Sequence, residues 1–342
     1  MRYPGRPWCC SVAAAIACWV VSTSAANRHL SRHEINGYAQ GTTYAITYYA
    51  REGVVLKSSI DSVLAVIDSS MSLYKPYSLI NRINGADNAV RIEDPHFLCV
   101  LRRSFDLYRQ SDGLFDITVA PLVQLWGFGA TPPSQLPDST AVIRTKACVG
   151  MDKVKLRGRR LIKQLPCVKL DMNGIAQGYS VDVLAEYLES RGVRHYLVEL
   201  GGELRVKGPK PDGTPFRVGI ERPGQREGEG SVINDVVEIQ EGAITTAGSY
   251  RKFLQDGDRR VSHHIDPKSG YPFATGIVSA TVYGKDAMTT DGFDNVMMAM
   301  PVEDAIAFVN RLDGMEVFIV YKDERGWVRD TMSTGFEKLI AN

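Results

Sequence analysis

Apolar residues recur along the chain with two spacings, one typical of strands and one typical of helices. Residues 42–50 alternate polar side chains with β-branched and aromatic ones, which predicts a strand. Strand-like runs also occur at 196–200, 216–220, 232–239, 278–283 and 317–321, and two more flank Gly158 between residues 154 and 170. Strands and helices are mixed without regular βαβ alternation, which predicts an α+β fold rather than a doubly wound sheet.

Other segments place apolar residues three or four positions apart, as expected of helices with one buried face. These segments are 58–71, 95–108, 177–191, a stretch that begins near Asp291, and 302–312. Ser58 and Ser59 are suited to cap the first helix, and Asp94 with Pro95 is suited to open the second. Gly192 is expected to end the third.

Two polar segments rich in glycine or proline, 129–137 and 223–230, are predicted as loops. No internal repeat is visible, and no change in composition marks a domain boundary. We therefore expect residues 27–342 to form a single unit.

The first 26 residues have the features of a secretory signal. Arg2 and Arg6 precede an apolar run over 8–21, and Ser24-Ala25-Ala26 offers small residues for cleavage. One alternative is a buried or membrane helix, although the run is short for a membrane span. Another is a lipoprotein signal with the lipid on Cys18. The signal predicts an exported protein.

Charge and composition exclude several classes of protein. The chain has 40 Lys and Arg residues against 39 Asp and Glu residues, a net charge of +1 that becomes −1 when the two arginines of the signal are removed. This balance provides no positive field for nucleic acid, so no nucleic-acid partner is expected. Hydrophobic residues make up 44% and charged residues 23% of the chain, close to globular averages, which excludes extended disorder.

The cysteines leave one pairing open. Cys99, Cys148 and Cys167 lie outside the signal, and three thiols do not make a disulfide framework. Cys148 and Cys167 flank a predicted hairpin, and they either pair in an oxidising compartment or remain reduced and buried.

Short catalytic signatures are absent from the sequence. It contains no G-x-G-x-x-G after a strand, no P-loop, no H-E-x-x-H, no C-x-x-C and no G-x-S-x-G. Four longer clusters therefore carry the functional hypotheses.

The first two clusters offer groups that can bind a ligand. In 113–129, Asp116 can hold a ligand amide or hydroxyl, or it can simply cap a loop above a buried Trp126. In 170–182, a strand passes into a helix start whose free N–H groups suit a phosphate, with Gly174 and Gly178 allowing close approach. The alternative for this second cluster is an ordinary capped helix.

The other two clusters carry groups for proton transfer and metal binding. Residues 244–250 and 262–272 form the third, where His263 is a candidate general base or phosphate contact, or a structural residue. In the fourth, Asp291 and Asn295 share a helix face, and Asp294 can join them. Such oxygen ligands suit Mg²⁺ or Ca²⁺, and the alternative is a solvated, acidic helix start.

Taken in this order, the clusters resemble the ApbE family, flavin transferases that move FMN from FAD to a threonine of a target protein. The similarity runs from about residue 41 to 320. Its motifs are Gln40-Gly41-Thr42, Met71-Ser72-Leu73-Tyr74, Phe115-Asp116, 171–182, Gly201-Gly202, 246–250, 263–272 and 291–295. The resemblance implies one catalytic unit with mixed, largely antiparallel sheets packed with helices, as in the T-fold.

The resemblance also implies roles for individual residues. The positions expected to line the FAD site are Gln40, Tyr74, Leu114, Phe115, Asp116, Asp171, Gln177 and Ile265. The Gly174 carbonyl, Asp291 and Asn295 would hold Mg²⁺ or another divalent cation, and His263 matches the histidine of the family motif.

The chain departs from the family pattern at five positions within these motifs. Gln40 stands where Met is usual, Gln177 where Lys is commoner, and Ala247 where Ser is usual. Asn295 replaces a threonine metal ligand, and His264 stands where an aliphatic residue is usual. An amide oxygen can ligate Mg²⁺ as a hydroxyl can, so these departures bear on affinity and rate more than on the fold.

The activity implied is metal-dependent transfer of FMN from FAD to a threonine hydroxyl of a redox protein, with release of AMP. The expected acceptor is a periplasmic or membrane-bound subunit with a short threonine-containing motif. The expected location is the periplasm, either free or anchored to the inner membrane as a lipoprotein. Two alternatives remain, an FAD-binding or storage protein and a metal-dependent FAD pyrophosphatase.

Overall fold

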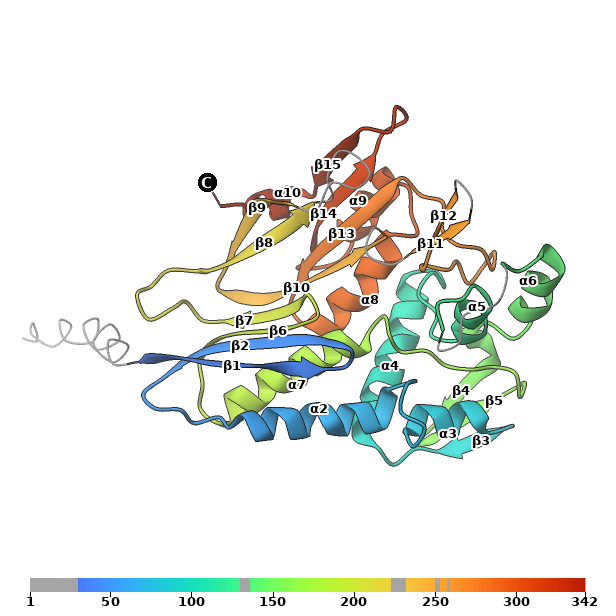
Figure 1. Cartoon of the computed structure of the whole chain (residues 1–342), viewed down its shortest axis with the longest axis horizontal. Coiled ribbons are helices and arrows are strands. Elements are labelled where there is room, and N and C mark those ends of the chain that lie inside the picture. Colours follow the sequence, from blue (N-terminus) through green and yellow to red (C-terminus); the bar gives the residue numbers. More distant parts are fainter. Residues whose placement is uncertain (1–29, 130–135, 223–231, 250–252, 257–258, 342) are drawn as a thin grey trace, which may run out of the picture.

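The fold is built on one large sheet. The computed structural model describes residues 30–129, 136–222, 232–249, 253–256 and 259–341 (Figure 1). The sheet has eight strands in the order β1-β2-β6-β7-β10-β13-β14-β15, and every neighbouring pair is antiparallel. These strands are β1 Ser31–Ala39, β2 Thr42–Ala50, β6 His195–Leu200, β7 Glu203–Lys207, β10 Glu241–Gly248, β13 Ile277–Gly284, β14 Glu316–Lys322 and β15 Val328–Met332.

Smaller sheets and helices surround the large sheet. The remaining strands are β3 Ala89–Arg91, β4 Val154–Arg157, β5 Arg160–Lys163, β8 Phe216–Arg222, β9 Val232–Ile239, β11 Phe253–Asp256 and β12 Arg259–Ser262. The helices are α2 Lys57–Met71, α3 Leu79–Gly85, α4 Pro95–Gln110, α5 Ala120–Leu125, α6 Ser139–Lys146, α7 Ala176–Ser190, α8 Ala287–Met297, α9 Val302–Val309 and α10 Thr334–Glu337, with a 3₁₀ turn, η2, at Met151–Lys153.

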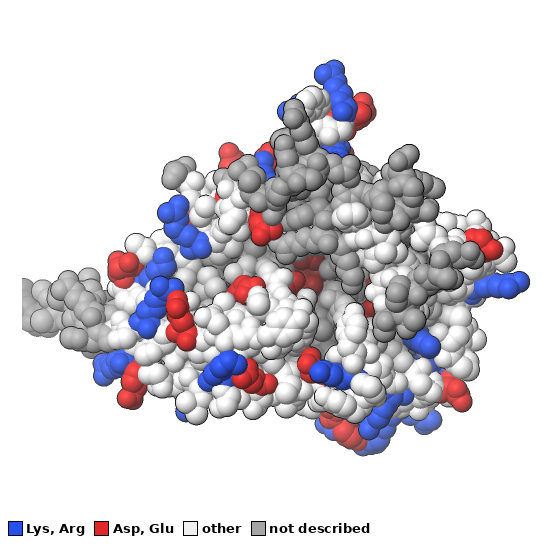
Figure 2. Space-filling model, in the orientation of Figure 1, with Lys and Arg blue, Asp and Glu red and all other residues white. Residues whose placement is uncertain are grey.

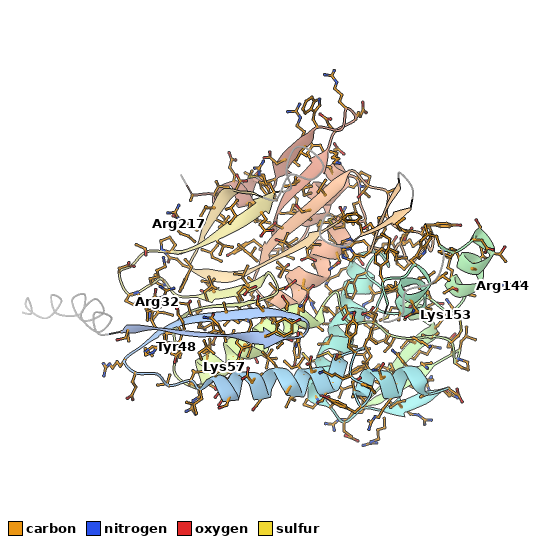
Figure 3. All side chains as sticks on the ribbon, in the orientation of Figure 1. Arg32, Tyr48, Lys57, Arg144, Lys153 and Arg217 are labelled. Atoms are coloured by element: carbon orange, nitrogen blue, oxygen red, sulfur yellow. A yellow bond between two sulfur atoms is a disulfide. The ribbon has the colours of Figure 1, made fainter. Side chains whose placement is uncertain are left out.

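Alternation of side chains along the strands buries both faces of the large sheet. In β6, Tyr196 and Val198 lie in an apolar cluster with α2 and α7, whereas Leu197 packs into a cluster on the opposite face with β8, β9 and α10. Tyr48 of β2 is buried on the same side as α2 (Figure 3). Helices α4, α8 and α9 share the largest cluster with β13 and β14. The sheet is therefore covered by helices on one face and mainly by a hairpin on the other.

The α+β prediction is confirmed, and the predicted strands at 42–50 and 196–200 match β2 and β6 closely. Asp94 caps α4 as expected, by accepting the N–H groups of His96 and Phe97. Two predictions about helix starts are wrong. Ser58 and Ser59 do not cap α2, because they lie inside its first turn and Leu56 is the capping residue. The helix expected near Asp291 begins at Ala287, which places Asp291 in the helix interior.

Some predictions fall on residues outside the described part of the chain. These are the signal segment, the loop at 223–230 and most of the loop at 129–137. Among the described residues, no helix has both the length and the apolar character needed to cross a membrane.

The open question about the cysteines has an answer in the structure. Cys148 and Cys167 form a disulfide, with their Cα atoms 5.5 Å apart. The bond joins the end of α6 to the segment that follows β5, and Cys99 is free and exposed.

Replacing both Cys148 and Cys167 with serine is expected to lower the free energy of unfolding by about 3 kcal/mol. The two residues are 19 positions apart, and the disulfide that joins them lowers the conformational entropy of the unfolded chain. Urea unfolding followed by circular dichroism measures the change, and Cys99→Ser is the matched control with little expected effect. Equal unfolding free energies for the double variant and the parent would contradict a stabilising disulfide.

Candidate functional site

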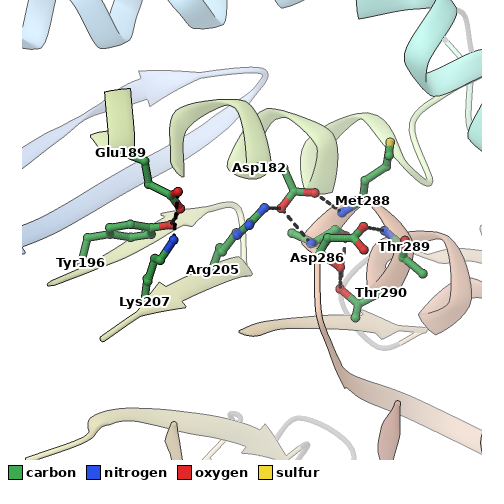
Figure 4. Close-up of polar contacts among 10 residues, drawn as sticks. Asp182, Glu189, Tyr196, Arg205, Lys207, Asp286, Met288, Thr289 and Thr290 are labelled. Carbon is green, nitrogen blue, oxygen red and sulfur yellow. Dashed lines mark hydrogen bonds and ion pairs between the residues drawn. The ribbon is translucent and has the colours of Figure 1, made fainter. Parts of the chain in front are cut away.

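Two carboxylates determine where α8 begins. Asp286 is its N-cap and accepts the Thr289 N–H at 2.9 Å. Asp182, from α7, accepts the N–H groups of Ala287 at 2.9 Å and Met288 at 2.8 Å (Figure 4). Both carboxylates satisfy N–H groups that a helix start leaves without partners. Helix α8 is thereby fixed to α7.

Asp182 also forms a largely buried ion pair. Its Oδ1 lies 2.7 Å from Nη1 of Arg205 in β7, and the Asp182 side chain is 9% exposed. One carboxylate therefore joins α7, α8 and the large sheet. It holds in place the helix that carries Asp291 and Asn295.

The variant Asp182→Ala is expected to lose about 3–5 kcal/mol of stability, because it leaves a largely buried guanidinium, 22% exposed, and two helix N–H groups without their partner. Asp286→Ala is a matched control, since it also removes a cap of α8 but should cost only about 1 kcal/mol. Thermal and urea unfolding measure both changes. Equal losses in the two variants would show that the ion pair with Arg205 contributes nothing.

The start of α7 approaches α8 so closely that only glycine fits at one position. A Cβ on Gly178 would lie 2.2 Å from the Ala287 carbonyl oxygen and 2.7 Å from Cβ of Asp291. The Gly178 N–H donates to Oδ2 of Asp291 at 2.8 Å. Gly174 lies beside Asn295, whose Nδ2 would be 3.4 Å from a Cβ at that glycine. The structure therefore brings together the three predicted metal ligands, Gly174, Asp291 and Asn295.

Several acidic side chains are buried around the contact between α7 and α8. Asp291 is 3% exposed and Asp294 is 1% exposed, so the alternative of a solvated helix start is wrong. Burial raises the pKa of Asp291 to about 7, and the charge of Asp182 acts in the same direction. Burial, followed by the charges of Asp291 and Glu203, raises the pKa of Asp294. Figure 2 shows acidic side chains within a hollow near the centre of one face.

The predicted ligands Gly174, Asp291 and Asn295 offer oxygen atoms, which fit a hard divalent cation. A nearby cation would favour the ionised forms of Asp291 and Asp294, which burial disfavours. Nδ2 of Asn295 donates to the Asp291 carbonyl and to Oδ1 of Asp294, both at 2.9 Å, which leaves its oxygen for other partners. Within the described ranges, no group of three or more His, Cys, Asp and Glu side chains has the arrangement of a metal site. The predicted set contains one carboxylate, one amide oxygen and one backbone carbonyl.

Asp116 is held by the backbone around it. Its Oδ1 accepts the N–H of Thr118 at 2.7 Å and the hydroxyl at 2.6 Å, and its Oδ2 accepts the Met151 N–H at 3.1 Å. Burial raises the pKa of Asp116, although these hydrogen bonds oppose the shift. The capping role considered from the sequence is therefore present. It shapes the loop that carries the neighbouring Phe115 and Leu114.

This loop contacts both the 170–182 segment and α8. The Asp171 N–H donates to the Ile117 carbonyl at 2.7 Å, and Val119 forms a parallel bridge with Lys169. The Phe115 ring approaches α8 at Gly292, where an added Cβ would lie 3.5 Å from it. The first, second and fourth clusters predicted from the sequence therefore meet in space.

Gln40 approaches the start of α7 from the large sheet, and Gln177 lies in the first turn of α7. Gln40 lies at the turn between β1 and β2 and donates from Nε2 to Oγ of Ser180 at 2.8 Å. Nε2 of Gln177 lies 2.9 Å from where a Cβ on Gly201 would stand, and Glu203 Oε2 is 3.3 Å from the same point. Because Gly201 has φ +67°, a larger residue there would be strained as well as crowded.

The third cluster places two histidine rings next to each other. The ring centroids of His263 and His264 are 3.9 Å apart. The ring of His263 lies edge-on to that of Phe128, with a centroid distance of 6.1 Å. His263 is half-buried, whereas His264 is buried. Burial, and then the neighbouring His263, lowers the pKa of His264 to about 3. His264 is therefore a neutral imidazole near neutral pH.

The segment that follows these histidines packs against the first cluster. Ile265 lies in an apolar cluster with Leu122 and Trp126, and Nε1 of Trp126 donates to the Gly270 carbonyl at 2.8 Å. Tyr74 lies apart from these contacts, at the turn after α2, and is 61% exposed, so its ring is accessible to a ligand.

Sequence reasoning missed the buried acids Asp182 and Glu203 as parts of the site. Both residues are buried. Glu203 follows Gly201-Gly202, and that pair was the available signal for a close approach of backbone and ligand. Asp182 gave no signal of its own, because its partners lie 23 and 105 residues away.

Both the sequence and the fold are similar to known proteins. The ApbE family model matches residues 40–319. The chain belongs to the ApbE family. A Vibrio cholerae relative named FAD:protein FMN transferase is 32% identical, and the match covers 98% of this chain and 99% of the relative. A relative of the same name from Escherichia coli K12 is 32% identical, with 86% and 84% covered.

Solved ApbE structures have the same fold. The flavin transferase ApbE from Vibrio cholerae superposes with a TM-score of 0.82 at 34% identity, covering 91% of this chain and 99% of that one. The apo form of the Pseudomonas stutzeri flavinyl transferase ApbE has a TM-score of 0.81 at 30% identity, covering 92% and 98%. The antiparallel sheet and its helices are therefore those of ApbE proteins, and the clusters that meet in this chain lie within the matched range.

Proposed function

We propose that this chain is an FAD:protein FMN transferase that moves FMN from FAD to a threonine hydroxyl of an acceptor protein in a reaction that needs a divalent cation. The observation that carries the proposal is the match over almost the whole chain to relatives named for this activity. The buried carboxylates Asp291 and Asp294 support the dependence on a cation.

The reaction is a phosphoryl-type transfer. The threonine oxygen attacks the phosphorus of the FMN half of FAD, a new P–O bond forms, and the bond to the bridging oxygen of the pyrophosphate breaks. AMP leaves with that oxygen, and the hydroxyl proton passes to a base. Positioning and stabilisation of charge dominate such transfers.

The residues of this chain divide these tasks. His263 is the proposed acceptor of the hydroxyl proton, because it is half-buried and is the histidine of the family motif. Asp291, Asn295 and the Gly174 carbonyl would hold Mg²⁺ or another divalent cation. When bound, that cation supplies neutralisation of charge on the pyrophosphate. Asp182 and Gly178 keep the helix that carries two of these ligands against α7.

The proposed FAD site extends from the cation ligands to the loop and the strand ends around them. Its residues are Gln40, Tyr74, Leu114, Phe115, Asp116, Asp171, Gln177 and Ile265. Asp116 and Phe115 are fixed by the contacts of their loop. Gln40 contacts the first turns of α7, which include Gln177, and exposed Tyr74 offers a ring for stacking. We infer that these contacts position the residues for FAD.

The acceptor and the location follow from the same proposal. We infer that the acceptor is a subunit of a periplasmic or membrane-bound redox complex with a threonine-containing motif. Export by the signal in residues 1–26 would place the enzyme in that compartment, with lipid on Cys18 as one form of attachment. Mass spectrometry of the mature N-terminus distinguishes a lipidated Cys18 from cleavage near Ala26.

The proposal is tested by incubating the mature protein with FAD, Mg²⁺ and a candidate acceptor, followed by intact mass measurement of the acceptor. The proposal predicts addition of one FMN, and none on an acceptor whose motif threonine is replaced by alanine. Free FMN and AMP with an unmodified acceptor would indicate an FAD pyrophosphatase instead. Unaltered FAD bound to the protein would indicate a carrier.

A further inference from the structure

The short segment between α6 and β4, residues 149–153, is tied at both ends to the chain that follows β5. At one end, the disulfide joins Cys148 to Cys167. At the other end, β4 pairs with β5, and the Gln164 N–H donates to the Lys153 carbonyl at 2.9 Å. Helix α6 and this hairpin lie at the same end of the molecule (Figure 1). The disulfide and the base of the hairpin therefore enclose the segment between them.

The enclosed segment contacts the loop that carries Asp116. The Gly150 N–H donates to Oγ1 of Thr118 at 2.6 Å, and the Met151 N–H donates to Oδ2 of Asp116 at 3.1 Å. The Thr118 hydroxyl in turn donates to Oδ1 of Asp116 at 2.6 Å. Gly150 and Met151 follow Cys148 by two and three positions. The position of these two N–H groups therefore depends on where Cys148 is held.

The chain after Cys167 holds the same loop through a second set of contacts. The Asp171 N–H donates to the Ile117 carbonyl at 2.7 Å, and Val119 forms a parallel bridge with Lys169. Lys169 and Asp171 follow Cys167 by two and four positions. Residues 116–119 therefore contact two segments of chain, and the disulfide joins these segments a few residues away from the contacts.

The contacts of the 116–119 loop are buried. Thr118 is 0% exposed, Asp116 is 8% exposed and Met151 is 2% exposed. Water therefore has little access to replace a hydrogen bond that is lost there, and a buried polar group without a partner costs free energy. A displacement of the enclosed segment would be followed by the Asp116 side chain.

We propose that the disulfide between Cys148 and Cys167 is a positioning element for FAD, because it fixes the two segments that hold Asp116 and the neighbouring Phe115. The inference deepens the proposed function and rests on the FAD site that it assigns. A loop that is already held in its bound arrangement loses less conformational entropy when the ligand binds. The disulfide therefore contributes to FAD affinity as well as to stability.

A positioning role and a purely structural role predict different results. A bond that only stabilises the fold can be removed without changing the FAD affinity of those molecules that remain folded. A positioning role requires weaker FAD binding by folded protein, and it requires that the effect passes through the 116–119 loop. Thr118→Val tests this path, since it removes the hydroxyl that links Asp116 to Gly150.

The experiment measures the FAD dissociation constant by flavin fluorescence titration, without Mg²⁺ or acceptor and at a temperature where thermal unfolding shows each variant to be folded. The variants are the double variant Cys148→Ser with Cys167→Ser, Thr118→Val, the triple variant that combines them, and Cys99→Ser as the matched control. We expect the double variant to bind FAD about 10-fold more weakly than the parent, and Cys99→Ser to bind like the parent. The triple variant should lose less affinity than the separate losses combined, because both changes act on one loop.

Reduction of the parent provides a second measurement that needs no substitution. Dithiothreitol converts Cys148 and Cys167 to thiols and becomes its own cyclic disulfide. Reduced parent should show the FAD affinity of the double variant, and the double variant should not respond to the reductant. Hydrogen exchange should become faster in residues 114–119 and 149–151 when the bond is absent.

Three results would overturn the proposal. They are parent-like FAD binding by the folded double variant, fully additive losses in the triple variant, and unchanged hydrogen exchange in residues 114–119. The proposed FMN transfer is tested separately by the mass of the acceptor. A parent protein whose FAD affinity depends on the disulfide but that modifies no acceptor would retain the role of the disulfide and contradict the transferase function.

Discussion

Replacing Asp291 with asparagine is expected to abolish FMN transfer while the protein remains folded. Asparagine has nearly the same shape, and its oxygen can still accept the Gly178 N–H that Asp291 Oδ2 accepts at 2.8 Å. The change removes the one carboxylate of the predicted cation site. We expect the rate to fall by roughly 1000-fold or more, because the bound cation contributes several kcal/mol of charge stabilisation.

The rate is measured as flavin attached to the acceptor at saturating FAD over a range of Mg²⁺ concentrations. Asp286→Asn is the matched control, since it makes the same chemical change at the N-cap of the same helix. It should leave the rate within a few-fold of the parent. Full activity of Asp291→Asn at low Mg²⁺ would remove Asp291 from the cation site.

His263→Ala is expected to slow FMN transfer far more than it weakens FAD binding. A general base contributes about 10²- to 10⁴-fold to rate, and its loss affects the step in which the threonine hydroxyl is deprotonated. In the proposed site other residues hold FAD, so its dissociation constant should change only a few-fold. Single-turnover transfer and flavin fluorescence titration measure the two quantities separately.

His33→Ala is a suitable control for this prediction, because His33 lies on β1 and stacks on Tyr48, away from the third cluster. His33→Ala should change neither the transfer rate nor the FAD dissociation constant by much. An unchanged transfer rate in His263→Ala would exclude His263 from the chemistry. A parallel loss of rate and FAD affinity would make it a ligand contact instead.

Local patterns were sufficient to predict many elements of the fold. Strand β2 and helix α4 were predicted because their signals are contained in the segments themselves, as alternation in one case and Asp94 with Pro95 in the other. The start of α8 was mispredicted although its N-cap, Asp286, is local, and a second capping interaction is not. Asp182, more than 100 residues earlier, supplies one of the caps. No local window contains that interaction.

The candidate site likewise combines features that local sequence predicts with features that depend on long-range packing. The spacing of Asp291 and Asn295 predicted that they share a helix face, and the structure places Gly174 beside Asn295. Burial of Asp294 and the close approach of Gly178 to Asp291 depend on how the sheet, α7 and α8 pack together. Sequence similarity identified the positions, but only the packing shows which of them contact each other.

An FAD:protein FMN transferase couples cleavage of FAD to modification of a protein. The most direct measurement is the amount of AMP released per FMN attached to the acceptor, by chromatography and intact mass on the same samples. We expect one AMP per attached FMN, and little AMP when the acceptor is omitted or its threonine is replaced by alanine. AMP released at the same rate without an acceptor, with no FMN attached when one is present, would contradict it.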